Sequence, residues 1–217
     1  YKWHDLPPGS GLLDLELGRE SELTHYDWIT DTTVHDGSAW AYMKNSKYKT
    51  TTDLVHYLID NVSKNGYMLL NIGPKPDGTI PEEDKNLLEG IGNWLDVNGE
   101  AIFETETWDQ YGEGPTKMNE AGPFSDNRAK LIYTAKDFRF TTKDNFLYAT
   151  ALGWPSKDFT IESIYKLFDN EIERVELLGS TDKVAWKHTR DGLHITRPDN
   201  KPCEHAYSFK ITRKEYL

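Results

Sequence analysis

The segment DLVHYLIDNVSKNGYMLLNIGPKPDGTIPEEDKNLLEGIGNWLDVNG, residues 53–99, contains the pattern that decides the fold. Its first part, residues 53–64, has apolar residues at the spacing of one helical face, with Thr52 as the expected N-cap and Gly66 as the expected stop. Residues 67–70 then form a continuous apolar run. Such a run is typical of a strand that is buried on both faces of a parallel sheet.

A second helix is expected to begin at Pro81, which is followed by acidic residues. A proline suits the first helical position, and carboxylates there face the positive end of the helix dipole. The pair Asn98-Gly99 is expected to end this helix. Residues 71–78 are rich in Gly, Pro, Asn and Asp and indicate a loop. Helix, buried strand, loop and helix follow one another as in an α/β layer.

The second half of the chain has a different pattern. Residues 111–124 are rich in Gly, Pro, Glu and Lys, which predicts a linker. Short strands separated by turn residues follow, and this spacing favours an antiparallel β-sandwich. The expected strands are 138–141, 146–152, 159–164, 172–178, 185–188, 193–196 and 206–211. We therefore predict two domains of different class, 1–112 and 113–217, that join near residue 112.

Composition excludes several classes of protein. The chain has 217 residues with 25 Lys+Arg, 36 Asp+Glu and a net charge of −11, and no basic stripe that would favour nucleic acid. No apolar run approaches the roughly 18 residues that span a bilayer, so no membrane partner is expected. Cys203 is the single cysteine, which excludes an internal disulfide and a cysteine-based zinc site. Because the chain begins at Tyr1 without a signal pattern, we expect a processed product or a fragment.

Residues 1–45 combine carboxylates with tryptophans and glycines. Aromatic rings stack on the apolar face of a pyranose and carboxylates transfer protons, so this mixture suits a sugar-processing cleft. The same composition also suits a long acidic loop whose tryptophans anchor it to the core.

Six phrases narrow these alternatives: residues 3–9 (WHDLPPG), 14–20 (DLELGRE), 28–33 (WITDTT), 40–42 (WAY), 69–80 (LLNIGPKPDGTI) and 94–102 (WLDVNGEAI). Their order and spacing over roughly residues 3–108 resemble the α-L-fucosidases of glycoside hydrolase family 29. Residues 147–149, 153–155 and 175–179 resemble the C-terminal β-sandwich of this family more loosely.

The resemblance implies the C-terminal portion of a (β/α)8-like catalytic barrel followed by an antiparallel β-sandwich. It also implies release of terminal α-L-fucose from fucosylated glycans with retention of configuration, which uses two carboxyl groups about 5 to 5.5 Å apart. In the family the attacking aspartate lies upstream of the segment that matches Tyr1 onward, and this chain has no candidate for it. We therefore expect one portion of a larger enzyme, inactive alone, whose partner is the missing N-terminal part of the barrel or a second copy.

The choice of acid/base candidates depends on one position at which this chain differs from the family pattern. Many family members place a glutamate directly after the tryptophan that matches Trp28, whereas this chain has Ile29, which cannot transfer a proton. The role then passes to another carboxylate of the same segment, belongs to the missing part, or is lost. Glu16 is the first candidate for the catalytic acid/base and Glu20 the second.

Three residues are candidates for substrate binding. The planar fork of Arg19 suits a sugar hydroxyl or the nucleophile carboxylate, or else a surface salt bridge. Asp31 is expected to bind sugar or orient its loop, or else to cap a turn. Trp40 is expected to form an apolar wall against the fucose methyl group, or else to pack in the core. His4 and His35 lack the spacing of metal ligands and this chemistry needs no metal, so no cofactor is expected.

Two other classes of function remain open. A non-catalytic carbohydrate-binding or remnant protein would account for Ile29 and for the absent nucleophile. A purely structural sandwich module would account for residues 113–217 but not for the first half. Family members tend to be secreted, periplasmic or lysosomal, so the resemblance implies an extracytoplasmic location.

Overall fold

The computed structural model describes residues 7, 9–37, 39–127 and 130–214. These residues form two compact units, one drawn from 1–93 and 117–131 and the other from 94–116 and 132–217. The first unit contains β1 (Leu13–Asp14), β2 (Trp28–Thr33), α1 (Thr51–Ser63), β3 (Gly66–Asn71) and the 3-10 helix η2 (Ser125–Asn127). Helix α2 (Glu82–Asn98) begins in the first unit and ends in the second. The second unit continues with the 3-10 helix η1 (Gly99–Ala101), β4 (Glu106–Glu113), β5 (Phe138–Lys143), β6 (Phe146–Ala151), β7 (Phe159–Ile161), β8 (Ile172–Leu177), β9 (Trp186–Thr189), β10 (Gly192–Ile195) and β11 (Tyr207–Arg213).

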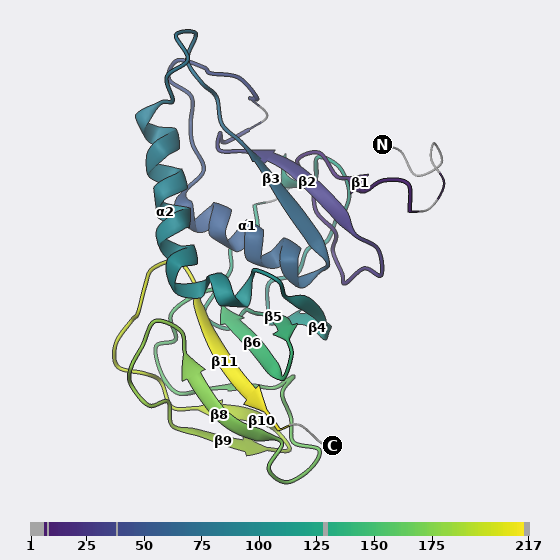
Figure 1. Ribbon diagram of the computed structural model, residues 1–217, viewed down its shortest axis with the longest axis vertical. Helices are drawn as coiled ribbons and strands as arrows, with labels where there is room; N and C mark the ends of the chain where they lie inside the picture. Colours follow the sequence, from purple (N-terminus) through teal and green to yellow (C-terminus); the bar gives the residue numbers. More distant parts are fainter. Residues whose placement is uncertain (1–6, 8, 38, 128–129, 215–217) are drawn as a thin grey trace. The chain divides into compact units, whose positions relative to one another are not determined.

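The first unit is a parallel sheet in the order β1-β2-β3 with α1 packed on one face (Figure 1). Thr30 on β2 hydrogen-bonds to the hydroxyl of Tyr57 on α1 at 2.8 Å, and Trp28 is fully buried. The predicted α/β layer is therefore confirmed. Strands of this kind, with helices on one face, form part of a (β/α)8-like barrel.

The ends of α1 differ from those predicted. Its N-cap is Thr50 rather than Thr52, because Thr50 and Asp53 form a reciprocal capping box. The residue with left-handed backbone after the helix is Asn65, with φ 72°, rather than Gly66. Gly66 is instead inside β3, where an added Cβ would lie 2.4 Å from the ring of Trp28.

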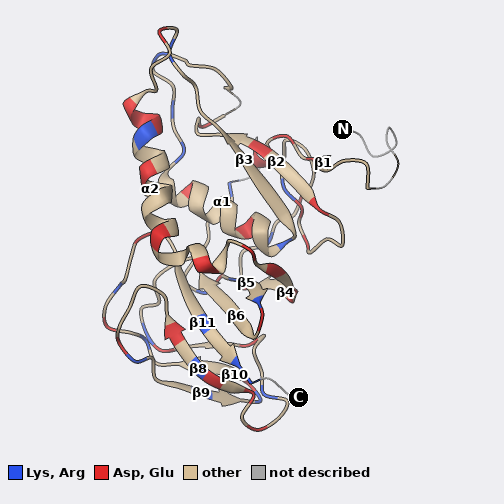
Figure 2. Ribbon diagram, in the orientation of Figure 1, with Lys and Arg blue, Asp and Glu red and all other residues tan. Residues whose placement is uncertain are grey.

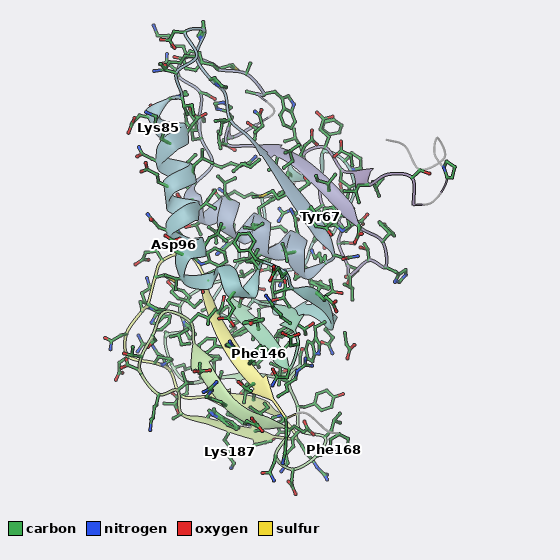
Figure 3. The ribbon with its side chains drawn as sticks, in the orientation of Figure 1. Tyr67, Lys85, Asp96, Phe146, Phe168 and Lys187 are labelled. Carbon is green, nitrogen blue, oxygen red and sulfur yellow. The ribbon has the colours of Figure 1, made fainter. Side chains whose placement is uncertain are left out.

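Strand β3 is not buried on both faces, so that part of the prediction is wrong. Tyr67, labelled in Figure 3, is 54% exposed and Leu69 is 59% exposed. Both side chains lie on the face opposite α1 and stay more than half exposed. This open face corresponds to the side that faces the interior of a closed barrel.

Buried charges tie α1 to the rest of the first unit. Asp60 accepts a hydrogen bond from Lys64 Nζ at 2.9 Å, and Arg19 lies 3.5 Å from the same carboxylate. The side chains of Asp60 and Lys64 are 0% and 1% exposed. Arg19 also donates to Asp126 at 3.1 Å, which attaches the segment 117–131 to this cluster.

The second unit is an antiparallel sandwich, as predicted. Its two sheets have the orders β4-β5-β6-β11-β8 and β7-β10-β9. Both supply the hydrophobic core, for example Phe140 and Phe209 from the first sheet and Leu193 from the second. Asp144 and Asn145 form the turn between β5 and β6, and Asp144 has a left-handed φ of 53°.

The segment that was predicted to be a linker is structured at both ends. Strand β4 extends through Glu113, and Gly122 forms a bridge with Arg19 in the first unit. The predicted join near residue 112 therefore falls inside a strand, and the spatial units interleave along the chain. The boundary of the two domains at 112 stays a prediction.

The Asp60→Ala variant should lower the free energy of unfolding by roughly 3–5 kcal/mol, because it leaves Lys64 charged and buried without its carboxylate. Urea denaturation followed by circular dichroism measures this loss. The Glu204→Ala control removes an exposed pair with Lys201 and should cost less than about 0.5 kcal/mol. Equal losses in the two variants would contradict a stabilising role for the buried cluster.

Candidate active site

The candidate site is built by side-chain alternation along the parallel strands. Trp28 and Thr30 of β2 face α1, so Ile29 and Asp31 face the open side of the sheet. Asp14 of β1 pairs in register with Ile29 and lies on that same open face. The chain after β1 continues the ladder, because the Leu17 amide donates to the Asp31 carbonyl at 2.9 Å.

Three carboxyl groups gather on this face near the carboxyl ends of β1 and β2. Glu16 lies two residues after Asp14 along the continued ladder, and its charge acts on Asp31. The carboxyl group of Asp14 lies close enough to that of Asp31 to raise the pKa of Asp31. Figure 2 colours all three among the acidic residues. We call Asp14, Glu16 and Asp31 the carboxylate cluster.

Burial raises the pKa of Asp31 above its ordinary value of 3.8, and the neighbouring charges of Asp14 and Glu16 raise it further. A carboxyl group with a raised pKa can hold a proton at a pH where an ordinary aspartate is ionised. Asp31 therefore has the chemical property that a proton donor needs.

The structure separates the two acid/base candidates. Glu20 accepts a hydrogen bond from the hydroxyl of Tyr26 at 3.0 Å, and the carbonyl of Glu20 accepts from Lys64 Nζ. Lys64 follows α1, so this part of the chain lies on the helix side of the sheet, near the start of β2. Glu16 belongs to the carboxylate cluster and Glu20 does not.

Arg19 also lies on the helix side. Its guanidinium stacks over the ring of Tyr57 at 4.3 Å and contacts Asp60 and Asp126. The side chain is 8% exposed, so the pairs are buried rather than surface salt bridges. The structure does not bring Arg19 into the carboxylate cluster, and its role in substrate binding stays a prediction.

Trp40 is held at the carboxyl edge of the sheet. Its carbonyl accepts a hydrogen bond from Asn71 Nδ2 at 2.9 Å, and Asn71 pairs in register with Thr33. Asn71 thus anchors the loop after β2. The indole of Trp40 is half-buried, and its contact with fucose stays a prediction.

Sequence reasoning missed Asp14 as the partner of Asp31. The signal was present, since residues 13–17 alternate strictly between leucine and an acidic residue, which is the pattern of a strand with one apolar face. His4 and the first residues of the phrase 3–9 lie outside the described residues. Across the part of the chain that the structure describes, no group of three His, Cys, Asp or Glu side chains suits a metal ion, and no helix could cross a membrane.

The Asp31→Asn variant should melt at a higher temperature than the parent chain at pH 7. Folding disfavours ionised Asp31, so the stability it contributes is fully present below the ordinary pKa and is lost as the pH rises through the raised pKa. Asparagine is uncharged and nearly the same size as aspartate, so it removes the charge without leaving a cavity. Thermal denaturation between pH 4 and pH 8 measures the difference, which should grow with pH.

Asp77→Asn is the control of opposite sign. The hydroxyl and amide of Thr79 donate to Asp77 and lower its pKa, so folding favours the ionised form there. This variant should not gain stability at pH 7. A melting temperature for Asp31→Asn that falls relative to the parent as pH rises would contradict the raised pKa.

Comparison with known families agrees with this arrangement. The family model described as alpha-L-fucosidase matches residues 10–100, and the model described as alpha-L-fucosidase C-terminal domain matches residues 130–212. The first match contains the carboxylate cluster, and the second contains most of the sandwich.

Individual relatives match most of this chain but less than half of their own length. Plasma alpha-L-fucosidase of Pongo abelii is 31% identical over 88% of this chain and 38% of its own length. Tissue alpha-L-fucosidase of Rattus norvegicus is 29% identical over 90% of this chain and 39% of its own length. The crystal structure of Thermotoga maritima alpha-fucosidase in complex with fucose superposes with a TM-score of 0.69 at 27% identity, covering 89% of this chain and 41% of that one. The chain thus spans about two-fifths of the relatives it matches, and it belongs to the α-L-fucosidases of glycoside hydrolase family 29.

Proposed function

We propose that this chain is the carboxyl-terminal part of a retaining α-L-fucosidase that releases terminal α-L-fucose from fucosylated glycans. The observation that carries the proposal is the carboxylate cluster on the open face of the parallel sheet, at the carboxyl ends of β1 and β2. Catalytic residues of barrel enzymes are found at this end of the strands. Relatives named as plasma and tissue enzymes support an extracytoplasmic location.

Glu16 is the proposed general acid/base. It belongs to the cluster, whereas Glu20 is bonded to Tyr26 on the helix side. In a retaining enzyme the same group first protonates the leaving oxygen and then deprotonates water. The attacking carboxylate is proposed to come from the part of the enzyme that this chain does not span, and Trp40 is the proposed apolar wall beside the sugar.

Asp31 is the second candidate for the proton donor. Its raised pKa favours the protonated form, and it follows Ile29 by two residues on the same face. Ile29 stands where many family members have a glutamate. The carboxyl group of Asp31 would take over the role of that glutamate, two residues nearer the carboxyl end of β2.

Glu16→Gln should lower kcat/KM for an aryl α-L-fucoside with a poor leaving group by about 10²–10⁴-fold, because glutamine cannot protonate the leaving oxygen. The assay uses the natural polypeptide that contains residues 1–217. With a good leaving group, added azide should restore turnover and yield an azide product of α configuration, since azide attacks the covalent intermediate without a general base.

Glu20→Gln is the matched control and should retain the parent rate within about threefold, because Glu20 bonds Tyr26 outside the cluster. If Asp31→Asn shows the azide rescue and Glu16→Gln does not, Asp31 is the acid/base. Full activity in both variants would remove the cluster from the mechanism.

A non-catalytic carbohydrate-binding protein is the alternative function, and Ile29 on the open face is the observation that favours it. This alternative predicts that the natural polypeptide binds methyl α-L-fucoside but releases no fucose from aryl fucosides. Isothermal titration calorimetry beside the hydrolysis assay separates the two functions.

A further inference from the structure

A second candidate site lies wholly within the sandwich unit. A cavity of about 560 Å³ opens between β4, the turn from β5 to β6, the segment that follows β7, and the end of β11. This volume is within the range of small-molecule sites, roughly 300–1,000 Å³. None of the residues that line it belongs to the carboxylate cluster.

Sheet irregularities shape the cavity. Thr107 of β4 pairs with Thr141 and Gly112 pairs with Arg139, so residues 108–111 oppose Phe140 alone on β5. The pairing of β11 with β8 also shifts, between Thr212 and Arg213. Bulges of this kind redirect side chains, and they are common beside functional sites. Here they turn residues from both strands toward the same cavity.

The opposite wall is held in place by hydrogen bonds. The carboxylate of Glu113 accepts from the amides of Glu162 at 3.1 Å and Ser163 at 2.6 Å. The side-chain oxygen of Gln110 accepts from the Ser163 hydroxyl at 2.9 Å. The segment after β7 is therefore fixed against β4, and the cavity is formed before any ligand arrives.

Exposed aromatic rings line this wall. Tyr165 is 49% exposed and Phe168, labelled in Figure 3, is 62% exposed. Trp108 lies across the cavity on β4 and packs edge-on against Phe140 with ring centroids 5.0 Å apart, so its position is fixed by the core. Rings of this kind stack on the apolar face of a sugar.

Planar polar groups complete the lining, among them Asp109 and Asn145. The charge of Arg213 is directed to the turn, because its Nη2 donates to the Asp144 carbonyl at 3.2 Å and its Nε to the Asn145 carbonyl at 3.4 Å. Asp109, Asp144 and Glu171 line the cavity together with Arg213 and Lys214, so charges of both signs are present and largely offset one another. The lining thus suits a neutral ligand with one apolar face and several hydroxyls.

We propose that this cavity binds a neutral saccharide unit, separately from the candidate active site. The proposal goes beyond the proposed function, because every lining residue belongs to the second unit and no catalytic group is required. Such a site would bind one sugar residue of a glycan while a different sugar residue of the same glycan is hydrolysed.

NMR titration tests the proposal with methyl α-L-fucoside, methyl β-D-galactoside and methyl N-acetyl-β-D-glucosaminide, and with glycerol as a reference polyol. At least one glycoside should give saturable shifts of the Trp108 indole resonance and of the amides from Ser163 to Phe168, with a millimolar Kd. Glycerol should give none. Absence of saturable shifts with all three glycosides, or equal shifts with glycerol, overturns the proposal.

Tyr165→Ala and Phe168→Ala should each raise that Kd at least about fivefold, because each removes a stacking ring. Phe103→Ala, which removes a ring that is 58% exposed outside the cavity, should leave the Kd within about twofold. Sedimentation velocity tests whether this face instead joins two copies of the chain. Self-association that is lost in Phe168→Ala, together with no glycoside-dependent shift, would identify an interface between copies and overturn the proposal. Loss of fucoside hydrolysis in Glu16→Gln with unchanged shifts at Trp108 would separate this site from the catalytic one.

Discussion

The register of β1, β2 and β3 is the constraint on which the candidate active site depends. A slip of one residue would turn Trp28 from the core to the open face and Asp31 from the open face to α1. The fully buried Trp28 ring and the bond from Thr30 to Tyr57 oppose such a slip. The same contacts that build the core of the first unit therefore also place the carboxylate cluster.

Charged side chains are arranged differently on the two faces of this sheet. On the helix side, Asp60 faces two cations, Lys64 and Arg19, so buried charge is paired. On the open face, Asp31 meets the like charges of Asp14 and Glu16 and its pKa rises after desolvation. Paired charge supports a fold, whereas clustered carboxyl groups cost stability and are retained where proton transfer is needed. This contrast argues for chemistry on the open face rather than for a structural role.

Local periodicity was enough to predict α1, α2 and the change to a sandwich, because helix and strand patterns are carried by neighbouring residues. The end of α1 could not be predicted in this way, since Gly66 is required by the ring of Trp28, a residue 38 positions away. Strand β4 was also missed. Its residues include glycine and glutamate, and it is held by pairing with β5 and by the packing of Trp108 on Phe140.

The candidate site shows the same division between local and tertiary information. The phrase that contains Glu16 and Glu20 could be recognised, but two glutamates four residues apart could not be ranked from the sequence. Leu17 separates them. It is 1% exposed and has a left-handed φ of 48°, a conformation that leucine rarely adopts. Its amide donates to Asp31 and its carbonyl accepts from the amide of Asp126, so tertiary contacts hold this turn. Because the chain turns at Leu17, Glu16 lies with the carboxylate cluster and Glu20 lies on the helix side. A strained backbone that tertiary contacts maintain beside a carboxyl group, as at Leu17, is typical of a functional site.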